Sequence, residues 1–297
     1  MKNVLVYCRQ IQAVKNPIAV SYRNAEIIAE ELGADLLMFK NDKLRHDHYD
    51  VILVPYFNRY TDYKTLKKLI NSNQKRFLLR TEYEPVIVSM KEFKPYLELG
   101  QNFERPELFL NLNLLIARKP NPITQKKYDC IYYSRYRAQR MEYCREYLQG
   151  EIYLSTHPKN HKHYFHAGCK PKLIKHVDWT EGREPLNLFR YSLYMEDPFS
   201  HKTFTGLGSR WYEAGFCNNV VFFDYRCENT IRKSEIAQYW PEIQNYIVHS
   251  HTELMQRIAE CNQDWERHLM IQKGWRANEL QERASMLNKF KQIIGID

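Results

Sequence analysis

Glycine is scarce in this sequence, which has 10 glycines in 297 residues, about half the usual share of roughly 7%. That scarcity excludes collagen-like and Gly-rich disordered chains, and it leaves little material for a phosphate-binding loop made of glycine. No apolar run approaches the ~20 residues of a membrane-spanning helix. The first residues continue polar after Cys8, unlike a secretory signal peptide. We therefore expect a cytoplasmic protein without a membrane anchor.

Paired cysteines are also missing, since the seven cysteines are scattered and form no Cys-x-x-Cys motif. An odd number without such spacing favours buried or free thiols in a reducing compartment over a disulfide framework. There is no internal repeat and no low-complexity tract. With 44% hydrophobic residues, the composition indicates a globular protein of one large or two medium domains.

Positive charge and tyrosine are abundant. Lysine and arginine total 44 against 35 aspartates and glutamates, which gives a net charge of +9, and there are 22 tyrosines. A basic surface with aromatic side chains suits nucleic acid, an anionic membrane surface or a nucleotide substrate. The composition does not choose among these partners, so the choice depends on local motifs.

Short apolar runs alternate with amphipathic helical patterns in the first third of the chain. This alternation is typical of a parallel α/β sheet. Ser21 is a suitable N-cap for the first helix, and Gly33 is suitable to end it. We predict strands over Asn3–Cys8, Asp35–Phe39, Val51–Pro55 and Arg76–Thr81, and helices over Ser21–Gly33 and Tyr63–Asn71.

The pattern breaks at the Lys-Pro-Asn-Pro segment 119–122, which cannot be helical, and restarts after it. Leu188–Met195 fits a helix-to-strand stretch. From Ser250 to Ile294 the chain is nearly continuous helix with Gly274 as a joint, and such a last helix often packs back on the first domain. The other predicted elements are the strands Tyr128–Tyr133, Gly150–Leu154 and Val220–Asp224 and the helices Arg137–Leu148 and Trp211–Phe216.

Two α/β halves in sequence indicate two Rossmann-like domains that face a cleft, where strand carboxyl ends and helix amino ends collect ligands. The predicted fold class is therefore α/β. We expect an N-terminal domain of residues 1–122, joined by a C-terminal helix at 275–297, and a second domain of residues 123–274.

Three arginines follow the strand that ends at Tyr133. Arg135, Arg137 and Arg140 stand where the next helix begins. Guanidinium groups and helix N-terminal amides both suit phosphate oxygens. Basic residues at a helix start are otherwise unfavourable against the helix dipole, which favours a phosphate site. The alternative is a solvated, charged helix face.

A loop with two glycines at 204–209 enters a short helix that carries Arg210 and Glu213 on one face. One carboxylate can accept both ribose hydroxyls, and an arginine beside it can bind a diphosphate. The pair therefore indicates a nucleotide-sugar site. The alternative is a plain i,i+3 ion pair worth roughly 0.2–0.5 kcal/mol.

Two acids follow the predicted strand Arg76–Thr81. Glu82 and Glu84 stand at its carboxyl edge, where either carboxylate could be a general base that deprotonates a hydroxyl attacking a sugar carbon. The alternative is an acid that caps a helix or lies in a solvated loop.

The segment from His157 to Cys169 has enough nitrogen and sulfur ligands for zinc. Its spacing matches no zinc pattern, and Lys159, Lys162 and Lys170 would repel a cation. We expect a solvated basic loop that can contact phosphate, and no metal site.

Two further segments interleave basic and aromatic residues. One runs from Tyr56 through Arg59 and Tyr60 to Lys68, and the other is Tyr132–Tyr136. Such side chains can stack on unpaired bases and hold backbone phosphates. A Tyr-rich rim around any cleft is the equal alternative.

With these motifs the sequence resembles the DNA β-glucosyltransferases of T-even bacteriophages, which move glucose from UDP-glucose to 5-hydroxymethylcytosine in duplex DNA. The segment that ends Ser134-Arg-Tyr-Arg-Ala-Gln-Arg140 resembles the family's strand-to-helix segment, and Arg137 and Arg140 fall on its two diphosphate arginines. Arg210-Trp-Tyr-Glu213 and the apolar strand after it resemble its nucleotide helix. The resemblance implies that Arg210 contacts phosphate and Glu213 holds the ribose.

The resemblance also implies roles elsewhere. The segment Arg80–Pro85 aligns with the one that holds the family's catalytic base, which makes Glu82 the base, with Glu84 near the sugar or acceptor. Ser21 stands where the family has an acid near the sugar, so the donor sugar can differ from glucose. The loop containing Glu184 resembles the one before the uracil-contacting backbone, so Glu184 joins Ser134 in the predicted UDP-sugar site.

The implied fold is GT-B, and the implied reaction is inverting transfer of glucose, or a related sugar such as arabinose, from a UDP-sugar to 5-hydroxymethylcytosine in phage DNA inside the infected host cell. The target base must be flipped out of the duplex. We expect a monomer with no tightly bound cofactor, and an accessory Mg²⁺ or Mn²⁺ on the diphosphate is compatible with this reading. DNA contacts are predicted for Arg59, Tyr60, Lys64, Lys67, Lys68, Lys159 and Lys162.

Two other functions remain open. One is a glycosyltransferase that acts on a lipid or polysaccharide, which predicts no response to DNA. The other is a non-catalytic nucleic-acid-binding protein, which predicts steeply salt-dependent DNA affinity without stabilisation by UDP.

Overall fold

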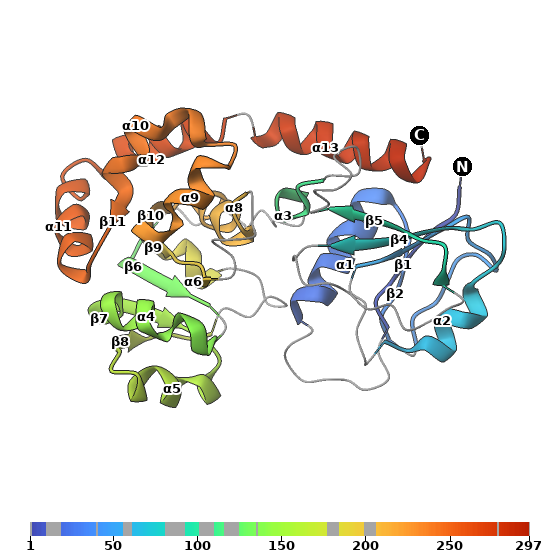
Figure 1. Ribbon diagram of the computed structural model, residues 1–297, viewed down its shortest axis with the longest axis horizontal. Helices are drawn as coiled ribbons and strands as arrows, with labels where there is room; N and C mark the ends of the chain where they lie inside the picture. Colours follow the sequence, from blue (N-terminus) through green and yellow to red (C-terminus); the bar gives the residue numbers. More distant parts are fainter. Residues whose placement is uncertain are drawn as a thin grey trace. The chain divides into compact units, whose positions relative to one another are not determined.

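The computed structural model describes residues 2–9, 19–39, 41–55, 61–80, 93–100, 110–115, 125–134, 136–176, 184–198, 206–277 and 279–296. The chain divides into two compact units (Figure 1). Unit 1 contains Met1–Ile116 and Glu279–Asp297, and unit 2 contains Ala117–Asn278. Each unit has its own parallel sheet, which confirms the predicted α/β class.

The sheet of unit 1 has five parallel strands in the order β2-β1-β3-β4-β5. In its centre Val4 lies opposite Val51, and Val51 lies opposite Lys75. The elements of this unit are β1 (Val4–Tyr7), α1 (Ala19–Leu32), β2 (Asp35–Leu37), β3 (Val51–Val54), α2 (Tyr63–Leu69), β4 (Lys75–Arg80), β5 (Leu97–Gly100), α3 (Leu112–Leu115) and α13 (Glu279–Ile294).

Both faces of this sheet are buried, as the apolar strand sequences require. Successive side chains of a strand point to opposite faces. Val4 and Val6 accordingly join the core beside α1, α3 and α13, whereas Leu5 and Tyr7 join the core beside α2. A strand that is buried on both faces needs a continuous apolar run instead of an alternating one, and β1 has such a run.

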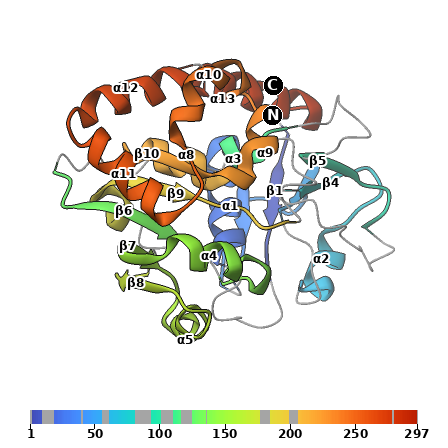
Figure 2. The same cartoon turned by 60° about the vertical axis from the view of Figure 1, so that its left-hand side comes forward.

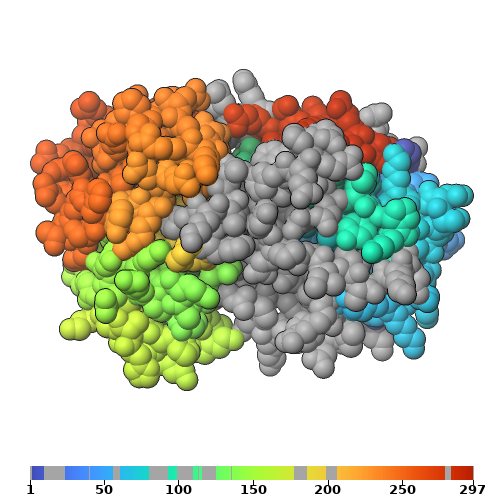
Figure 3. All heavy atoms as spheres, in the orientation of Figure 1, coloured from blue at the N-terminus to red at the C-terminus, as the bar shows by residue number. Residues whose placement is uncertain are grey.

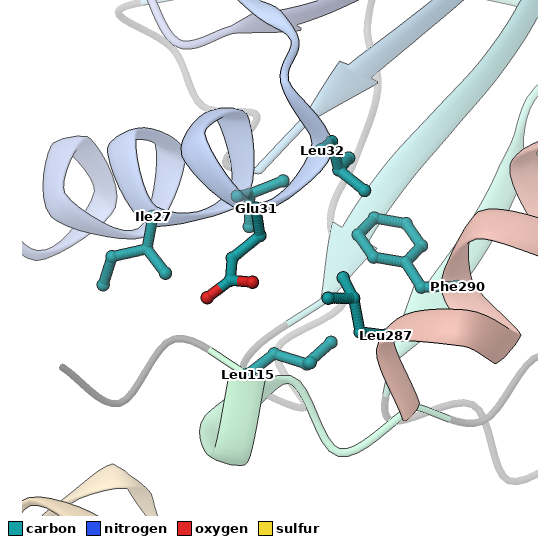
Figure 4. A pocket seen from close by; sticks show the side chains of 7 residues that line it. Ile27, Glu31, Leu32, Leu115, Leu287 and Phe290 are labelled. Carbon is teal, nitrogen blue, oxygen red and sulfur yellow. The ribbon is translucent and has the colours of Figure 1, made fainter. Parts of the chain in front are cut away.

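The C-terminal helix α13 belongs to unit 1, as the sequence predicted. Its side chains Leu287 and Phe290 face α1 and α3, where Leu115 completes a small apolar pocket (Figure 4). Arg283 on the same helix donates to the Glu31 carboxylate and, over 3.2 Å, to the carbonyl of Leu115. Apolar burial and these polar contacts therefore hold α13 on this unit.

Unit 2 has a six-stranded parallel sheet in the order β11-β10-β9-β6-β7-β8. Figures 1 and 2 both show β6, β7 and β8 in this sequence, with α5 beyond β8. Its elements are β6 (Tyr128–Tyr133), α4 (Met141–Tyr147), β7 (Gln149–Ser155), α5 (His161–His166), β8 (Lys170–Leu173), α6 (Glu184–Asn187), β9 (Phe189–Tyr194), α8 (Ser209–Phe216), β10 (Val220–Asp224), α9 (Glu228–Arg232), α10 (Trp240–Ile243), β11 (Ile247–Val248), α11 (His251–Cys261) and α12 (Trp265–Trp275).

The helices of unit 2 are anchored on its central strands. Helix α8 packs on β9 and β10, and α12 packs on β10. The rings of Trp211 and Phe223 lie 5.5 Å apart between α8 and β10. The side-chain amide of Gln272 accepts from the Val221 N–H over 2.8 Å and donates to the Val221 carbonyl over 2.9 Å, as a neighbouring strand would. The ring contact holds α8 on the sheet, and the amide contacts hold α12 on it.

Two sequence expectations about helices are wrong, and a third helix differs in its first turn. Helix α1 begins at Ala19, so Ser21 lies inside the helix and is not its N-cap. Gly274 lies inside α12 and not at a joint, because one helical glycine costs only about 1 kcal/mol and the burial of Trp275 next to it outweighs that cost. The predicted helix Arg137–Leu148 starts with a 3₁₀ turn, Ala138–Arg140, before α4.

The histidine segment is another difference, because it is not a loop. It forms a 3₁₀ turn, Pro158–Asn160, followed by α5. The His157 ring accepts from the Lys159 N–H over 3.2 Å, and Pro158 occupies the first position, where its missing N–H costs nothing. Helix α5 lies at the surface of unit 2, in lime at the lower left of Figure 3.

The strands β5, β8 and β11 have no counterpart in the sequence prediction. They are two to four residues long, and β8 reads Lys-Pro-Lys-Leu, so their pattern is too short or too polar to identify them. The helix-to-strand stretch predicted around Leu188 includes β9. Within the described ranges, no helix combines the length and apolar character that crossing a bilayer requires.

Candidate nucleotide-binding site

The sheet of unit 2 reverses its strand order between β6 and β9. From β6 the chain proceeds to β7 and β8 on one side, and from β9 it proceeds to β10 and β11 on the other. At such a switch point the two loops after the strands separate and leave a crevice at the carboxyl edge, where ligands bind in open α/β sheets. Ser134 follows β6 and Met195 follows β9 at this edge.

Five charged side chains form a chain of ion pairs at this edge, which we call the arginine row. Arg210 lies 2.8 Å from one oxygen of Glu196, and Arg140 lies 3.5 Å from the other. Arg140 also lies 3.3 Å from Asp197, and Arg137 lies 3.7 Å from the same carboxylate oxygen. Two carboxylates thus alternate with the three arginines that the sequence assigned to a diphosphate.

The centre of the arginine row is buried. The side chains of Arg140 and Glu196 are 5% and 8% exposed, whereas that of Arg137 is 42% exposed. Burial alone would raise the pKa of Glu196, but the charges of Arg210 and Arg140 outweigh burial and hold that pKa below its ordinary value. Burial alone would lower the pKa of Arg210, and Glu196 reverses the direction. Glu196 and Arg210 therefore both stay ionised.

Two guanidinium donors in the row lack a partner. Nε of Arg140 and Nη1 of Arg210 are buried and form no hydrogen bond to the part of the chain that the structure describes. The other donors of Arg140 reach Oγ of Ser134 over 2.5 Å and the hydroxyl of Tyr132 over 3.2 Å. A buried donor without a partner costs roughly 1–3 kcal/mol, so each of these two donors would gain from a hydrogen-bond acceptor.

Helix α8 brings its first turn to the same place. The N–H of its N-cap residue Gly208 donates to the Tyr194 hydroxyl over 2.7 Å, and that hydroxyl also bonds Glu196. A Cβ at position 208 would lie 3.1 Å from the Glu196 carboxylate and 3.2 Å from the Tyr194 hydroxyl. Arg210 also donates to the Met195 carbonyl over 2.7 Å. Glycine at 208 therefore permits this close approach of α8 to the end of β9.

Glu213, which the sequence assigned to the ribose, lies one turn after Arg210 on α8 but is fully buried. The Tyr133 hydroxyl lies 3.3 Å from Oε2 of Glu213 and 3.0 Å from the Arg210 carbonyl. The ion pair of Arg210 is formed with Glu196, so the alternative of a plain Arg210–Glu213 pair is not what places this arginine.

The other predicted site residues belong to other elements or lie outside the described residues. Glu82, Glu84, Arg59, Tyr60 and Arg135 are outside them. Ser21 and Glu184 are placed only by their backbone, in α1 and as the first residue of α6. The lysines predicted for DNA are exposed, and they are Lys64, Lys67 and Lys68 on α2, Lys159 before α5 and Lys162 on α5.

The sequence analysis missed Glu196 and Asp197. They directly follow the apolar strand β9 at its carboxyl edge. The same signal, acids after a predicted strand, singled out Glu82 and Glu84. Leu188–Met195, which precedes Glu196, fits a helix-to-strand stretch, so its pattern does not clearly mark a strand that ends there.

The charge pattern does not fit a metal ion held by the protein alone. Both carboxylates at the site are ion-paired with arginines. Across the described residues, no group of three or more His, Cys, Asp or Glu side chains could hold a metal.

Comparison with known proteins supplies the fold relationship. No model of a protein family and no curated protein matches this sequence. Solved structures of T4 phage beta-glucosyltransferase do match: one is 17% identical with a TM-score of 0.72, and one in complex with UDP and Mn²⁺ is 16% identical with a TM-score of 0.69, each covering 99% of both chains.

An alpha-glucosyltransferase in complex with UDP and a 13-mer DNA containing an HMU base is also similar, at 10% identity and a TM-score of 0.56, over 97% of this chain and 95% of that one. These identities are low, so the likeness establishes the fold. The resemblance inferred from the sequence is thereby confirmed at that level: the chain has the GT-B fold of the phage β-glucosyltransferases.

Proposed function

We propose that this protein is an inverting glycosyltransferase that moves a sugar from a UDP-sugar to 5-hydroxymethylcytosine in DNA. The observation that carries the proposal is the arginine row at the switch point of unit 2, with two buried guanidinium donors that lack an acceptor. The similar glucosyltransferases, described with UDP-glucose, with UDP or with DNA, support the choice of donor and acceptor.

In this proposal the arginines assist departure of UDP. Negative charge grows on the diphosphate as the bond to the sugar breaks. Arg140 and Arg210 would donate to it from fixed positions, and the half-exposed Arg137 would close on it from the solvent side. Glu213 would hold the ribose once its buried carboxylate becomes accessible, and Glu184 would lie near the uracil.

The remaining parts are assigned from the sequence. Glu82 would take the proton of the acceptor hydroxymethyl group, with Glu84 and Ser21 near the sugar. We assign the acceptor DNA to residues 1–122 with 275–297 and the UDP-sugar to residues 123–274. The exposed lysines of α2 and α5 would hold phosphates, which offsets the cost of flipping the base.

Two measurements test the proposal. UDP at 100 times its Kd should stabilise the protein by about 2.7 kcal/mol, which raises its melting temperature. Labelled UDP-sugars should transfer label to duplex DNA that contains 5-hydroxymethylcytosine, and Glu82→Gln should abolish this transfer while UDP binding persists. Absence of transfer from every UDP-sugar would refute the proposal.

The same assays separate the alternatives. Transfer to lipid or polysaccharide but not to DNA would identify a different acceptor. DNA binding without any response to UDP would identify a non-catalytic nucleic-acid-binding protein.

A further inference from the structure

We propose that Glu196 and Asp197 are positioning residues that hold the three diphosphate arginines in one rigid row. This inference rests on the proposed function, because it assumes that the row binds the diphosphate of the donor. Nothing in the sequence resemblance assigned a role to either carboxylate.

Three arginines repel one another, so this repulsion must be offset before they can share one anion site. Arg140 and Arg210 both reach Glu196, one on each carboxylate oxygen, so Glu196 neutralises the repulsion between them and sets their spacing. Asp197 does the same for Arg140 and Arg137. A guanidinium group has five N–H donors, and each carboxylate accepts from only some of them. The remaining donors are left for the ligand.

The position of Glu196 argues against a carboxylate that merely occupies the anion site until the nucleotide displaces it. Its side chain is 8% exposed and is bonded by the Tyr194 hydroxyl, which Gly208 in turn contacts. Arg210 also donates to the carbonyl of Met195, the residue before Glu196. Glu196 is therefore held by several partners at once, and any movement that released the arginines would break these bonds.

The charge balance of the row also supports a positioning role for the two carboxylates. Arg140 and Arg210 with Glu196 and Asp197 sum to zero, so the buried centre gains little by net charge alone. Binding of a diphosphate then depends on donors held in the correct orientation, which is the preorganisation that stabilises developing charge. The row is expected to lose affinity when its orientation is lost, even though removal of a negative charge makes the site more positive.

Loss of the Glu196 charge should weaken UDP binding more than loss of the Asp197 charge. Glu196 bridges two well-buried arginines at 2.8 and 3.5 Å. Asp197 bridges Arg140 to Arg137, which is 42% exposed and 3.7 Å away, so solvent weakens that half of the bridge. We expect Glu196→Gln to have a larger effect than Asp197→Asn.

The test measures uridine, UMP and UDP binding by calorimetry for the wild type, Glu196→Gln and Asp197→Asn. Glu196→Gln should weaken UDP at least tenfold, equivalent to about 1.4 kcal/mol, and UMP less, while uridine changes by less than about twofold. The matched control is Glu151→Gln, an exposed glutamate on β7 that pairs with Lys172, which should bind all three ligands like the wild type.

Each outcome decides the inference. UDP binding by Glu196→Gln that equals or exceeds that of the wild type would show that Glu196 is a competitor and would overturn it. Equal losses for uridine and UDP would show a general structural defect and would also overturn it. If Glu196→Gln does not fold, Asp197→Asn decides, through the same selective loss for UDP over uridine. A wild type that binds uridine but gains nothing from the diphosphate refutes the proposed function itself.

Discussion

Gly215 lies directly against Arg276, since a Cβ at position 215 would fall 2.5 Å from Nε of Arg276. Arg276 is buried, and its guanidinium carbon lies 3.7 Å from the centre of the Trp211 ring. Gly215 and Trp211 are both on α8, the helix that carries Arg210. Because residue 215 has no side chain, Arg276 at the end of α12 packs directly against α8, the helix of Arg210.

Gly215→Ala should destabilise unit 2 because the new methyl group must displace a buried, stacked guanidinium. Overpacking of this kind costs about 1–3 kcal/mol. The matched control is Gly274→Ala, which places a methyl group where no atom lies within 4 Å apart from its chain neighbours and the nearby helix backbone, and it should stabilise α12 by about 0.5–1 kcal/mol. Urea denaturation of both variants checks the prediction, and a stable Gly215→Ala would contradict the close contact.

Arg140→Lys should weaken both folding and UDP binding. Lysine keeps the charge, but a single ammonium cannot reach Ser134, Tyr132 and Asp197 as the guanidinium does. We expect a loss of about 1–3 kcal/mol in unfolding free energy and at least a tenfold loss in UDP affinity. Arg145→Lys, at an exposed position on α4, is the control and should stay within about 0.5 kcal/mol. Unchanged UDP affinity in Arg140→Lys would remove this arginine from the site.

Asp35 should make unit 1 sensitive to acid. Burial alone would raise the pKa of Asp35, but hydrogen bonds from Tyr49, over 2.6 Å, and from Arg45 hold that pKa below its ordinary value. The folded state thus binds this proton less tightly than the unfolded chain. The stability contribution is full above the unfolded pKa of about 3.9 and is lost as pH falls through the folded value.

Asp35→Asn should therefore cost about 1–3 kcal/mol at neutral pH and flatten the decline of stability below about pH 4. Denaturation measured from pH 7 to pH 3 checks this, with the exposed Asp47→Asn as control. If the unfolding free energy of Asp35→Asn falls below pH 4 as steeply as that of the wild type, other groups cause the fall.

The exposed lysines of α2 should set the salt dependence of DNA binding. Each phosphate contact contributes about 0.9 to the slope of log K against log salt concentration. If Lys64, Lys67 and Lys68 each hold a phosphate, replacing all three by alanine should reduce the slope by about 3. The double variant of Lys159 and Lys162 separately tests the 3₁₀ turn Pro158–Asn160 together with α5. Lys172→Ala, which breaks the pair with Glu151, is the control. A slope that no variant changes would place the DNA elsewhere.

The apolar patterns in the sequence were sufficient to predict the α/β class, most central strands and the return of the last helix. Burial on both faces leaves a continuous apolar run such as that of β1, and a helical stripe such as Leu287 and Phe290 needs a partner surface. The sequence also singled out Arg137, Arg140 and Arg210. Their charges follow a strand or begin a helix, and the sequence shows such positions without any distant contact.

The tertiary structure alone decided which strands are neighbours and which charges meet. β6 and β9 pair across more than fifty residues, and this pairing creates the switch point. Arg140 and Glu196 are 56 positions apart, so no local spacing reveals their contact. Backbone hydrogen bonding between distant strands brings both carboxyl edges together, and burial then makes each charge depend on the partners found there. The sequence determined which arginines follow a strand or begin a helix, and the fold determined that two carboxylates join them in one row.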